Sequence, residues 1–218
     1  GRNVLEVSAV LPGPTPTHEW TAEYLGKTKP APPWRADPPR PNTLCEVREG
    51  ALFIADRGDQ SGDYFYYAYP WNTDPAAESV VEARVRVVSG WNNIILCNGV
   101  HYERVGLYPD HIDLYEAKRQ YAMDTTDDYH TYRVVIQNND ILVYVDGVLR
   151  LDGRGTFKTP GPAGRNDVRF GAANSPGKGE AYWQSVRIRA ASTFATLYDV
   201  ALTIQPRASG TEAPRAAR

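Results

Sequence analysis

Apolar residues alternate with polar ones along much of the chain, in short runs that end at turn-forming residues. The clearest runs cover 130–137 and 141–145, and Asp146-Gly147 follows the second run at once. A period of two places every second side chain on one face of a strand, and Asp-Gly is a strong signal for a two-residue hairpin turn. The pattern therefore predicts a β-meander over residues 128–151.

Similar runs recur every ~8–12 residues from Thr43 onward, a spacing typical of sandwiches and barrels. No convincing helical period appears before Ala190. Many short strands with tight turns favour an all-β fold, a two-sheet antiparallel sandwich. The expected strands are 43–48, 51–55, 64–69, 80–88, 93–97, 100–107, 112–116, those of the meander, 168–172 and 181–189.

Proline divides this domain from its N-terminal flank. The chain has 17 prolines, many of them within residues 11–41, and proline removes a ladder donor and fixes φ. We expect an extended arm there, without strand or helix, pinned to the domain by Trp20, Tyr24 and Trp34. The expected parts are an arm over 1–42 with an edge strand at 4–10, the sandwich over 43–190, and a C-terminal extension over 191–218 that holds a short helix or last strand at 191–204 and is partly mobile.

Four segments carry a resemblance to a known superfamily. They are Gly50-Ala-Leu-Phe-Ile-Ala-Asp56, Val81-Glu-Ala-Arg-Val-Arg-Val87, His130-Thr-Tyr-Arg-Val-Val135 with Val143-Tyr-Val-Asp-Gly147, and Gly179-Glu-Ala-Tyr-Trp-Gln-Ser-Val-Arg-Ile188. In this order they resemble the concanavalin A-like lectin/glucanase superfamily, in its laminin-G-like branch. The resemblance implies a jelly-roll sandwich. It also implies a carbohydrate partner, because members commonly bind or cleave polysaccharides.

Charge and cysteine content narrow the function classes. The 24 basic and 26 acidic residues nearly balance, so we expect no nucleic-acid partner. The apolar runs are too short to cross a bilayer, so we expect no membrane partner. The composition favours an extracellular or periplasmic location. Cys45 and Cys97 form either a disulfide, if their strands are neighbours, or two buried thiols.

The densest polar and aromatic cluster lies between residues 91 and 115. Aromatic platforms with Asn, Asp and His side chains are a common way to bind sugars. The alternative is ordinary sandwich aromatics and polar turns. Trp71, in the loop that follows the expected 64–69 strand, is also expected to be an exposed aromatic platform. The candidate ligand-binding residues of the cluster are Trp91, Asn92, His101, Tyr102, Glu103, Tyr108, His111 and Tyr115.

Glu82, Arg84 and Arg86 form a charged stripe on one face of the 80–88 strand. Forked guanidinium groups bind uronate or sulfate, so Arg84 and Arg86 are added to the ligand-binding set and favour acidic glycans. The stripe is similar to the Arg/Glu strand of jelly-roll polysaccharide lyases. The alternative is a solvated face with cross-strand ion pairs. Under the lyase reading the candidate catalytic residues are Glu82, Arg84, His101, His111 and Tyr102.

No run of alternating carboxylates, as a retaining glucanase of this superfamily needs, occurs in the chain. The nearest pair, Asp113 and Glu116, is expected on opposite faces of a strand. Asp56, Asp59 and Asp63 are either a calcium site or turn formers; no other cofactor is expected. His130 is expected to be a packed strand residue.

These observations predict a secreted jelly-roll domain that binds carbohydrate. A second interpretation is an enzyme that cleaves polysaccharide, by β-elimination or by hydrolysis, and the sequence leaves open whether catalysis occurs. A third is a structural or assembly module that forms a homo-oligomer through the N-terminal arm.

Overall fold

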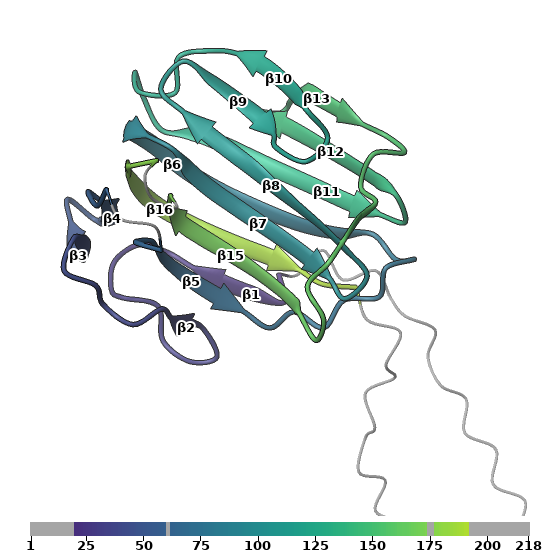
Figure 1. Cartoon of the computed structure of the whole chain (residues 1–218), viewed down its shortest axis with the longest axis horizontal. Coiled ribbons are helices and arrows are strands. Elements are labelled where there is room, and N and C mark those ends of the chain that lie inside the picture. The colour runs from purple at the N-terminus through teal and green to yellow at the C-terminus, as the bar shows by residue number, and fades with distance from the viewer. Residues whose placement is uncertain (1–19, 60–61, 174–176, 192–218) are drawn as a thin grey trace, which may run out of the picture.

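The computed structural model describes residues 20–59, 62–173 and 177–191, which form two layers of antiparallel strands (Figure 1). No helix occurs in these ranges. Accordingly, none of the described residues forms a helix that is long and apolar enough to span a bilayer. The predicted all-β sandwich is confirmed.

Each layer is a sheet of eight strands. Sheet A contains, in spatial order, β13 (Val148–Gly153), β12 (Asp140–Val145), β11 (His130–Gln137), β6 (Ser79–Gly90), β16 (Gly179–Arg189), β4 (Ala51–Asp56) and β3 (Thr43–Arg48), with β1 (Ala22–Tyr24) beside β16. Sheet B contains β10 (Arg119–Ala122), β9 (His111–Leu114), β8 (His101–Tyr108), β7 (Asn92–Asn98), β15 (Asn166–Ala172), β5 (Phe65–Tyr69) and β2 (Arg35–Ala36), with β14 (Thr159–Pro160) beside β8.

The meander predicted from the sequence is present as β11, β12 and β13, which are neighbours in sheet A. The turn between β12 and β13 consists of Asp146 and Gly147, with φ values of 49° and 81°. Two central residues with positive φ are the mark of a type I′ turn, which matches the right-handed twist of the flanking strands. The Asp-Gly signal therefore identified the turn correctly.

The core lies between the sheets and is built from alternate strand residues. On β6, Val81, Ala83, Val85 and Val87 point inward, as their spacing predicted. At the centre, the ring of Phe170 on β15 packs against four other aromatic rings that come from both sheets and from the N-terminal arm. These rings belong to Tyr24, Trp34, Tyr67 and Trp183.

The arm differs from the prediction that residues 11–41 hold no strand. The short strands β1 and β2 contain no proline. β2 is the last strand of sheet B, and β1 pairs with the end of the interior strand β16 of sheet A. Tyr24 and Trp34 are only 6% and 7% exposed, so they belong to the core. The expected strand at 4–10 and the C-terminal extension beyond Ala191 lie outside the described residues.

The two cysteines lie in different sheets, and both are free thiols. Cys45 is on β3 of sheet A, where its Sγ is 3.8 Å from the Tyr67 hydroxyl. Cys97 is on β7 of sheet B, where its Sγ is 3.1 Å from the Arg165 carbonyl oxygen. The strands are therefore not neighbours, and the condition stated for a disulfide is not met.

Candidate functional site

The outer face of sheet B carries much of the predicted polar and aromatic cluster. Because Ile94 and Leu96 on β7 and Val105 and Leu107 on β8 point into the core, their neighbours in sequence point outward. We call this surface the sheet B face. It presents Asn93, Tyr102, Arg104, Tyr108, His111, Asp113 and Tyr115, with Trp91 just before β7.

One row across this face alternates polar side chains with glycines. Tyr66, Gly171, Asn93, Gly106 and Asp113 are successive partners on β5, β15, β7, β8 and β9. Asn93 Nδ2 donates to the Tyr66 hydroxyl at 2.9 Å, two strands away. This bond is possible because Gly171 has no side chain between the two groups. At the other end of the row, the Gly106 amide donates to Asp113 Oδ1 at 3.1 Å.

Trp91 is the centre of a ladder of stacked rings above this row. Its ring is 6.1 Å from that of Tyr108, with an interplanar angle of 6°, and 5.5 Å from that of Tyr115. His111 continues the ladder at 4.2 Å from Tyr108. A Cβ on Gly106 would lie 3.1 Å from Trp91 Nε1 and 2.3 Å from Asp113 Oδ1. The glycine therefore makes room for the indole.

The backbone of Trp91 is anchored on both sides. Its amide donates to the Lys178 carbonyl at 2.8 Å, and its carbonyl accepts the Ala173 amide at 3.0 Å. These two backbone hydrogen bonds fix the position of Trp91 at the centre of the ladder. All four rings are half-buried, so part of each remains open to solvent.

Three arginines of this face have a carboxylate partner, and one of them, Arg104, contacts the ladder. The Arg104 guanidinium lies 3.8 Å from the Tyr115 ring centre and 2.6 Å from Glu116. Burial alone would lower the pKa of Arg104, but the bond to Glu116 raises it. Arg165 and Arg169 share the single carboxylate of Asp167 at 2.8 and 3.0 Å, so both have an acidic partner although one positive charge of this trio is not neutralised.

Two buried polar atoms near Gly106 lack a hydrogen-bond partner. They are the Trp91 Nε1 donor and the Asn93 Oδ1 acceptor, and Asn93 is 0% exposed. Buried polar atoms are nearly always bonded in folded proteins, and those that are not often mark a functional position. The face thus offers one donor and one acceptor beneath its aromatic ladder.

Burial keeps the phenols of this face in their neutral, proton-donating form. Burial raises the pKa of Tyr66 and Tyr102, and raises that of Tyr108 to about 12. Burial also raises the pKa of the Asp113 carboxyl. These phenols stay protonated at neutral pH and serve as hydrogen-bond donors and acceptors.

Three residues of the predicted ligand set lie beneath or beside this face. Glu103 is 0% exposed, and its carboxylate accepts backbone amides of Arg104, Glu116 and Ala117 at 2.7–3.0 Å. Burial raises the pKa of Glu103, while these amides oppose the rise. Asn92 is 0% exposed and donates to two backbone carbonyls. His101 packs edge-on against the buried ring of Phe157, at 5.8 Å.

The charged stripe lies on the opposite side of the molecule, on the outer face of sheet A. Arg84 Nε donates to Gln184 Oε1 at 2.7 Å, and the Arg86 guanidinium lies over the rings of Tyr129 and Tyr182. Glu82 is the cross-strand partner of both Arg133 and Arg187. The structure therefore does not bring Arg84 or Arg86 together with His111 or Tyr102. Ion pairs across the strands, the alternative weighed above, are what this face contains.

Two other sequence expectations were wrong. Glu116 and Asp113 lie on the same side of sheet B, because β9 ends at Leu114 and Glu116 turns back to Arg104. Trp71 is 3% exposed and its Nε1 donates to the Cys97 carbonyl at 2.9 Å, so it is a core residue. Sequence reasoning also passed over Tyr66 and Arg104, which the strand alternation alone would have placed outward.

The acidic turn after β4 is organised by local hydrogen bonds. Asp56 Oδ1 accepts the Gly58 amide at 2.9 Å, and Asp63 Oδ2 accepts Asn42 Nδ2 at 3.1 Å. Within the described residues, no group of three or more His, Cys, Asp or Glu side chains is arranged to hold a metal. Asp59 contributes to no such group. The calcium site stays a prediction.

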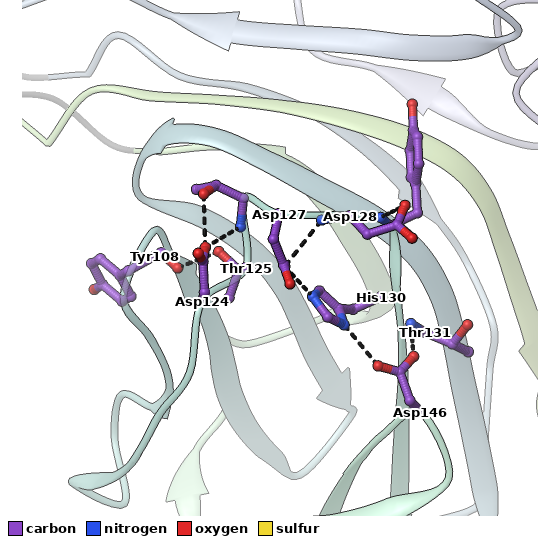
Figure 2. A network of polar contacts seen from close by, with 10 residues as sticks. Tyr108, Asp124, Thr125, Asp127, Asp128, His130, Thr131 and Asp146 are labelled. Atoms are coloured by element: carbon purple, nitrogen blue, oxygen red, sulfur yellow. Dashed lines mark hydrogen bonds and ion pairs between the residues drawn. The ribbon is translucent and has the colours of Figure 1, made fainter.

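His130 is held between two carboxylates at the start of β11 (Figure 2). Its Nδ1 is 2.7 Å from Asp146 and its Nε2 is 2.9 Å from Asp127. Burial alone would lower the pKa of His130, but the two carboxylates raise it overall. The pKa of Asp146 is lowered: burial opposes this, and the Thr131 amide and His130 outweigh it. The imidazole joins the segment before β11 to the turn between β12 and β13.

Comparisons with known proteins bear on the fold. No protein-family model matches the chain, and no curated protein matches it. Among solved structures, a sialidase superposes with a TM-score of 0.54 at 16% identity, covering 72% of this chain and 17% of its own. A Bacillus subtilis protein of unknown function with a galectin-like fold gives 0.55 at 8% identity, covering 78% and 96%. A Crh5 transglycosylase gives 0.51 at 15% identity, covering 78% and 85%.

The chain spans about a sixth of the sialidase and most of the other two proteins. At these identities the similarity establishes the architecture. Together with the two facing sheets and the strand order, it confirms the sequence resemblance: this chain has the concanavalin A-like jelly-roll fold.

Proposed function

We propose that the sheet B face binds carbohydrate. The observation that carries this proposal is the ladder of His111, Tyr108, Trp91 and Tyr115, lying over buried polar atoms that lack partners. Sugars offer apolar C–H faces to aromatic rings and hydroxyls to fixed donors and acceptors. The ladder supplies the first kind of contact.

The polar contacts come from the row beneath the ladder. Asn93 Oδ1 would accept a sugar hydroxyl proton and Trp91 Nε1 would donate to a hydroxyl oxygen, which gives each buried atom a partner. The protonated phenols of Tyr66 and Tyr102 add groups of both kinds. Small shifts of the half-buried rings would be needed to admit the ligand.

Charge pairing favours a neutral glycan over an acidic one. The preference for acidic glycans rested on Arg84 and Arg86, which lie on the other sheet. On the sheet B face, Arg104 and Arg169 are each engaged by a carboxylate, so a uronate would compete with an existing ion pair. A transglycosylase and a sialidase are among the solved structures that share this fold, which is consistent with a sugar ligand on it.

The test is affinity electrophoresis of the whole chain in gels that contain neutral glucans, galactans, chitosan or alginate. Trp91→Ala should weaken binding by about tenfold or more, the effect typical of a central aromatic contact. Trp91→Phe removes the Nε1 donor and part of the ring area, so its binding should lie between that of the wild type and that of Trp91→Ala. Tyr182→Ala, which removes a half-exposed ring from the outer face of sheet A, is the matched control and should bind like the wild type.

The possible outcomes distinguish carbohydrate binding at this face from binding elsewhere and from lyase activity. Unretarded migration of the folded wild type in every gel would refute carbohydrate binding. Equal losses for Trp91→Ala and Tyr182→Ala would refute this face as the site. Incubation with alginate, followed by ultraviolet absorbance of an unsaturated uronate, tests the lyase alternative. The raised pKa values of Tyr66 and Tyr102 disfavour it, because neither phenol is poised to abstract a proton.

A further inference from the structure

A small cavity lies on the outer face of sheet A, on the opposite side of the sandwich from the sheet B face. Its volume is about 290 Å³, and it is lined by Glu82, Thr131, Arg133, Tyr144 and Gly147. Tyr144, Arg133 and Glu82 are cross-strand partners on β12, β11 and β6. The cavity therefore sits over three adjacent strands, next to the turn between β12 and β13.

The charged groups of the cavity are close to one another without forming hydrogen bonds. Glu82 Oε2 lies 3.6 Å from Arg133 Nη1, and Glu82 Oε1 lies 3.8 Å from Arg187 Nη1. Both distances exceed the usual range of about 2.7–3.2 Å for such bonds. The Arg133 donors and the Glu82 acceptors therefore keep most of their bonding capacity for a third group.

The rim of the cavity is fixed by the network around His130. Asp146 accepts the Thr131 amide at 2.8 Å and lies 2.7 Å from His130 Nδ1, as Figure 2 shows. Gly147 follows Asp146 in the turn, and a Cβ there would meet nothing within 4 Å. Thr131 and Gly147 are thus held near one another at the turn end of the cavity, and Gly147 adds no side chain that could block it. Because these groups are already ordered, a ligand would lose little free energy in fixing them, which favours binding.

The chemistry of the lining selects a class of ligand. Arg133 and Glu82 neutralise one another, so neither a free anion nor a free cation is favoured, whereas a group that both donates and accepts is satisfied by the pair. Tyr144 offers a ring for an apolar face. The volume is at the lower limit of the ~300–1,000 Å³ usual for ligand pockets. It suits a single ring.

We propose that this cavity is a second binding site, which takes one neutral, hydroxyl-rich ring such as a monosaccharide or the end of a glycan chain. Arg133 donates to one hydroxyl oxygen, Glu82 accepts the proton of a neighbouring hydroxyl, and Tyr144 covers the ring. The site shares no residue with the sheet B face, so this proposal can be tested independently of the function proposed there.

The experiment is a titration of the isotope-labelled chain with glucose, galactose, mannose, N-acetylglucosamine and glucuronate at millimolar concentrations, followed by two-dimensional amide NMR. Signals of Thr131 and Gly147 should shift with at least one neutral sugar and less with glucuronate. Arg133→Gln should weaken this binding by about tenfold or more, as the loss of a charge-assisted hydrogen bond does. Tyr144→Ala should act in the same direction.

Arg187→Gln is the matched control. Like Arg133→Gln, it removes one positive charge beside Glu82, but Arg187 does not line the cavity. It should bind like the wild type. The proposal is overturned if no sugar shifts the Thr131 and Gly147 signals of the folded wild type, if glucuronate binds best, or if Arg133→Gln and Arg187→Gln lose binding equally. Shifts confined to residues 91–115 would locate sugar at the sheet B face and would also overturn it.

Discussion

Asp146 combines a backbone role with an electrostatic one. Its positive φ completes the turn before β13, and its carboxylate holds His130 and the Thr131 amide. Aspartate is one of the few residues other than glycine that tolerates this φ, and it can bond local groups at the same time. A single side chain thus fixes the turn, the start of β11 and the rim of the cavity.

The His130 network should make stability depend on pH. The pKa of His130 is raised in the folded state, so its contribution is complete below the unfolded value of about 6.5 and is lost as the pH rises through the folded value. Urea unfolding should therefore show that His130→Gln lowers the free energy of unfolding more at about pH 5 than at about pH 9. Because both carboxylates are about half exposed, we expect a difference of at most about 1 kcal/mol.

Asp146→Asn is the control for this prediction, because asparagine keeps the turn geometry and an acceptor for Thr131 while the charge is removed. The His130-dependent difference should become smaller in this background and should not vanish, because Asp127 still pairs with His130. The lowered pKa of Asp146 adds stability above about pH 3.9 that is lost as the pH falls through the folded value. An equal effect of His130→Gln at both pH values would contradict the assignment.

Single residues were the least predictable from sequence. Tyr102, Tyr108 and Tyr115 of the predicted cluster lie on the outer face of sheet B, but Glu103 and Asn92 were placed among the ligand groups because their side chains are polar. Both satisfy backbone groups inside the fold. Polarity alone does not distinguish a side chain that hydrogen-bonds a backbone turn from one that contacts a ligand. The difference depends on which backbone segments pack against the side chain in the folded protein.

At the scale of elements, the strands were predictable and the sheets they join were not. β3 and β11 were predicted at their observed bounds. In β11 the reason is the period of two, because buried residues alternate there with half-buried ones, whereas β3 is half-buried at its start and exposed at its end. The sequence pattern missed β10 and β14, which are short and largely exposed. Pairing between distant strands, such as β6 with β16, leaves no local signal, so Glu82 and His111 were placed in one candidate site although they lie on opposite faces.

The arm offers a test at this scale. Trp34 lies 5.0 Å from the ring of Tyr69 and 5.4 Å from that of Phe170. Trp34→Ala should lower the free energy of unfolding by about 3–5 kcal/mol, as burial of a large ring requires. Chemical denaturation measures this loss, and Leu25→Ala, at a side chain 48% exposed, should cost less than about 1 kcal/mol. A small loss for Trp34→Ala would mean that the arm is a detachable flank.

At the scale of the whole molecule, the two sheets carry separate chemistry. The sheet B face holds stacked rings over a row with two glycines, and the outer face of sheet A holds arginine–carboxylate pairs around a small cavity. Self-association through residues 1–42 stays a prediction. Because Tyr24 and Trp34 belong to the core, light scattering should compare the full chain with one that begins at Trp20, and not with one cut at residue 42.

The thiols give a prediction for the molecule as a whole. Cys45 and Cys97 belong to opposite sheets. Cys45 packs against the core between the sheets, whereas Cys97 follows the inward-pointing Leu96 and so points away from the core, which leaves the two sulfurs too far apart for a disulfide. Denatured protein should therefore react with two equivalents of a thiol reagent, and the melting temperature should not change on addition of a reductant. A melting temperature that falls in reductant, together with fewer reactive thiols, would contradict this arrangement.

The arginine–carboxylate pairs of sheet A also bear on strand register. A slip of β16 against β6 by two residues would keep every apolar side chain on the inner face, so the hydrophobic pattern cannot reject it. Glu82 now faces Arg187; a slip in one direction would set Arg187 opposite Arg84, and in the other it would set Arg187 opposite Val80. Like charges opposite one another destabilise a sheet. The outer face of sheet A thus helps to select the one alignment among those that the core would accept equally.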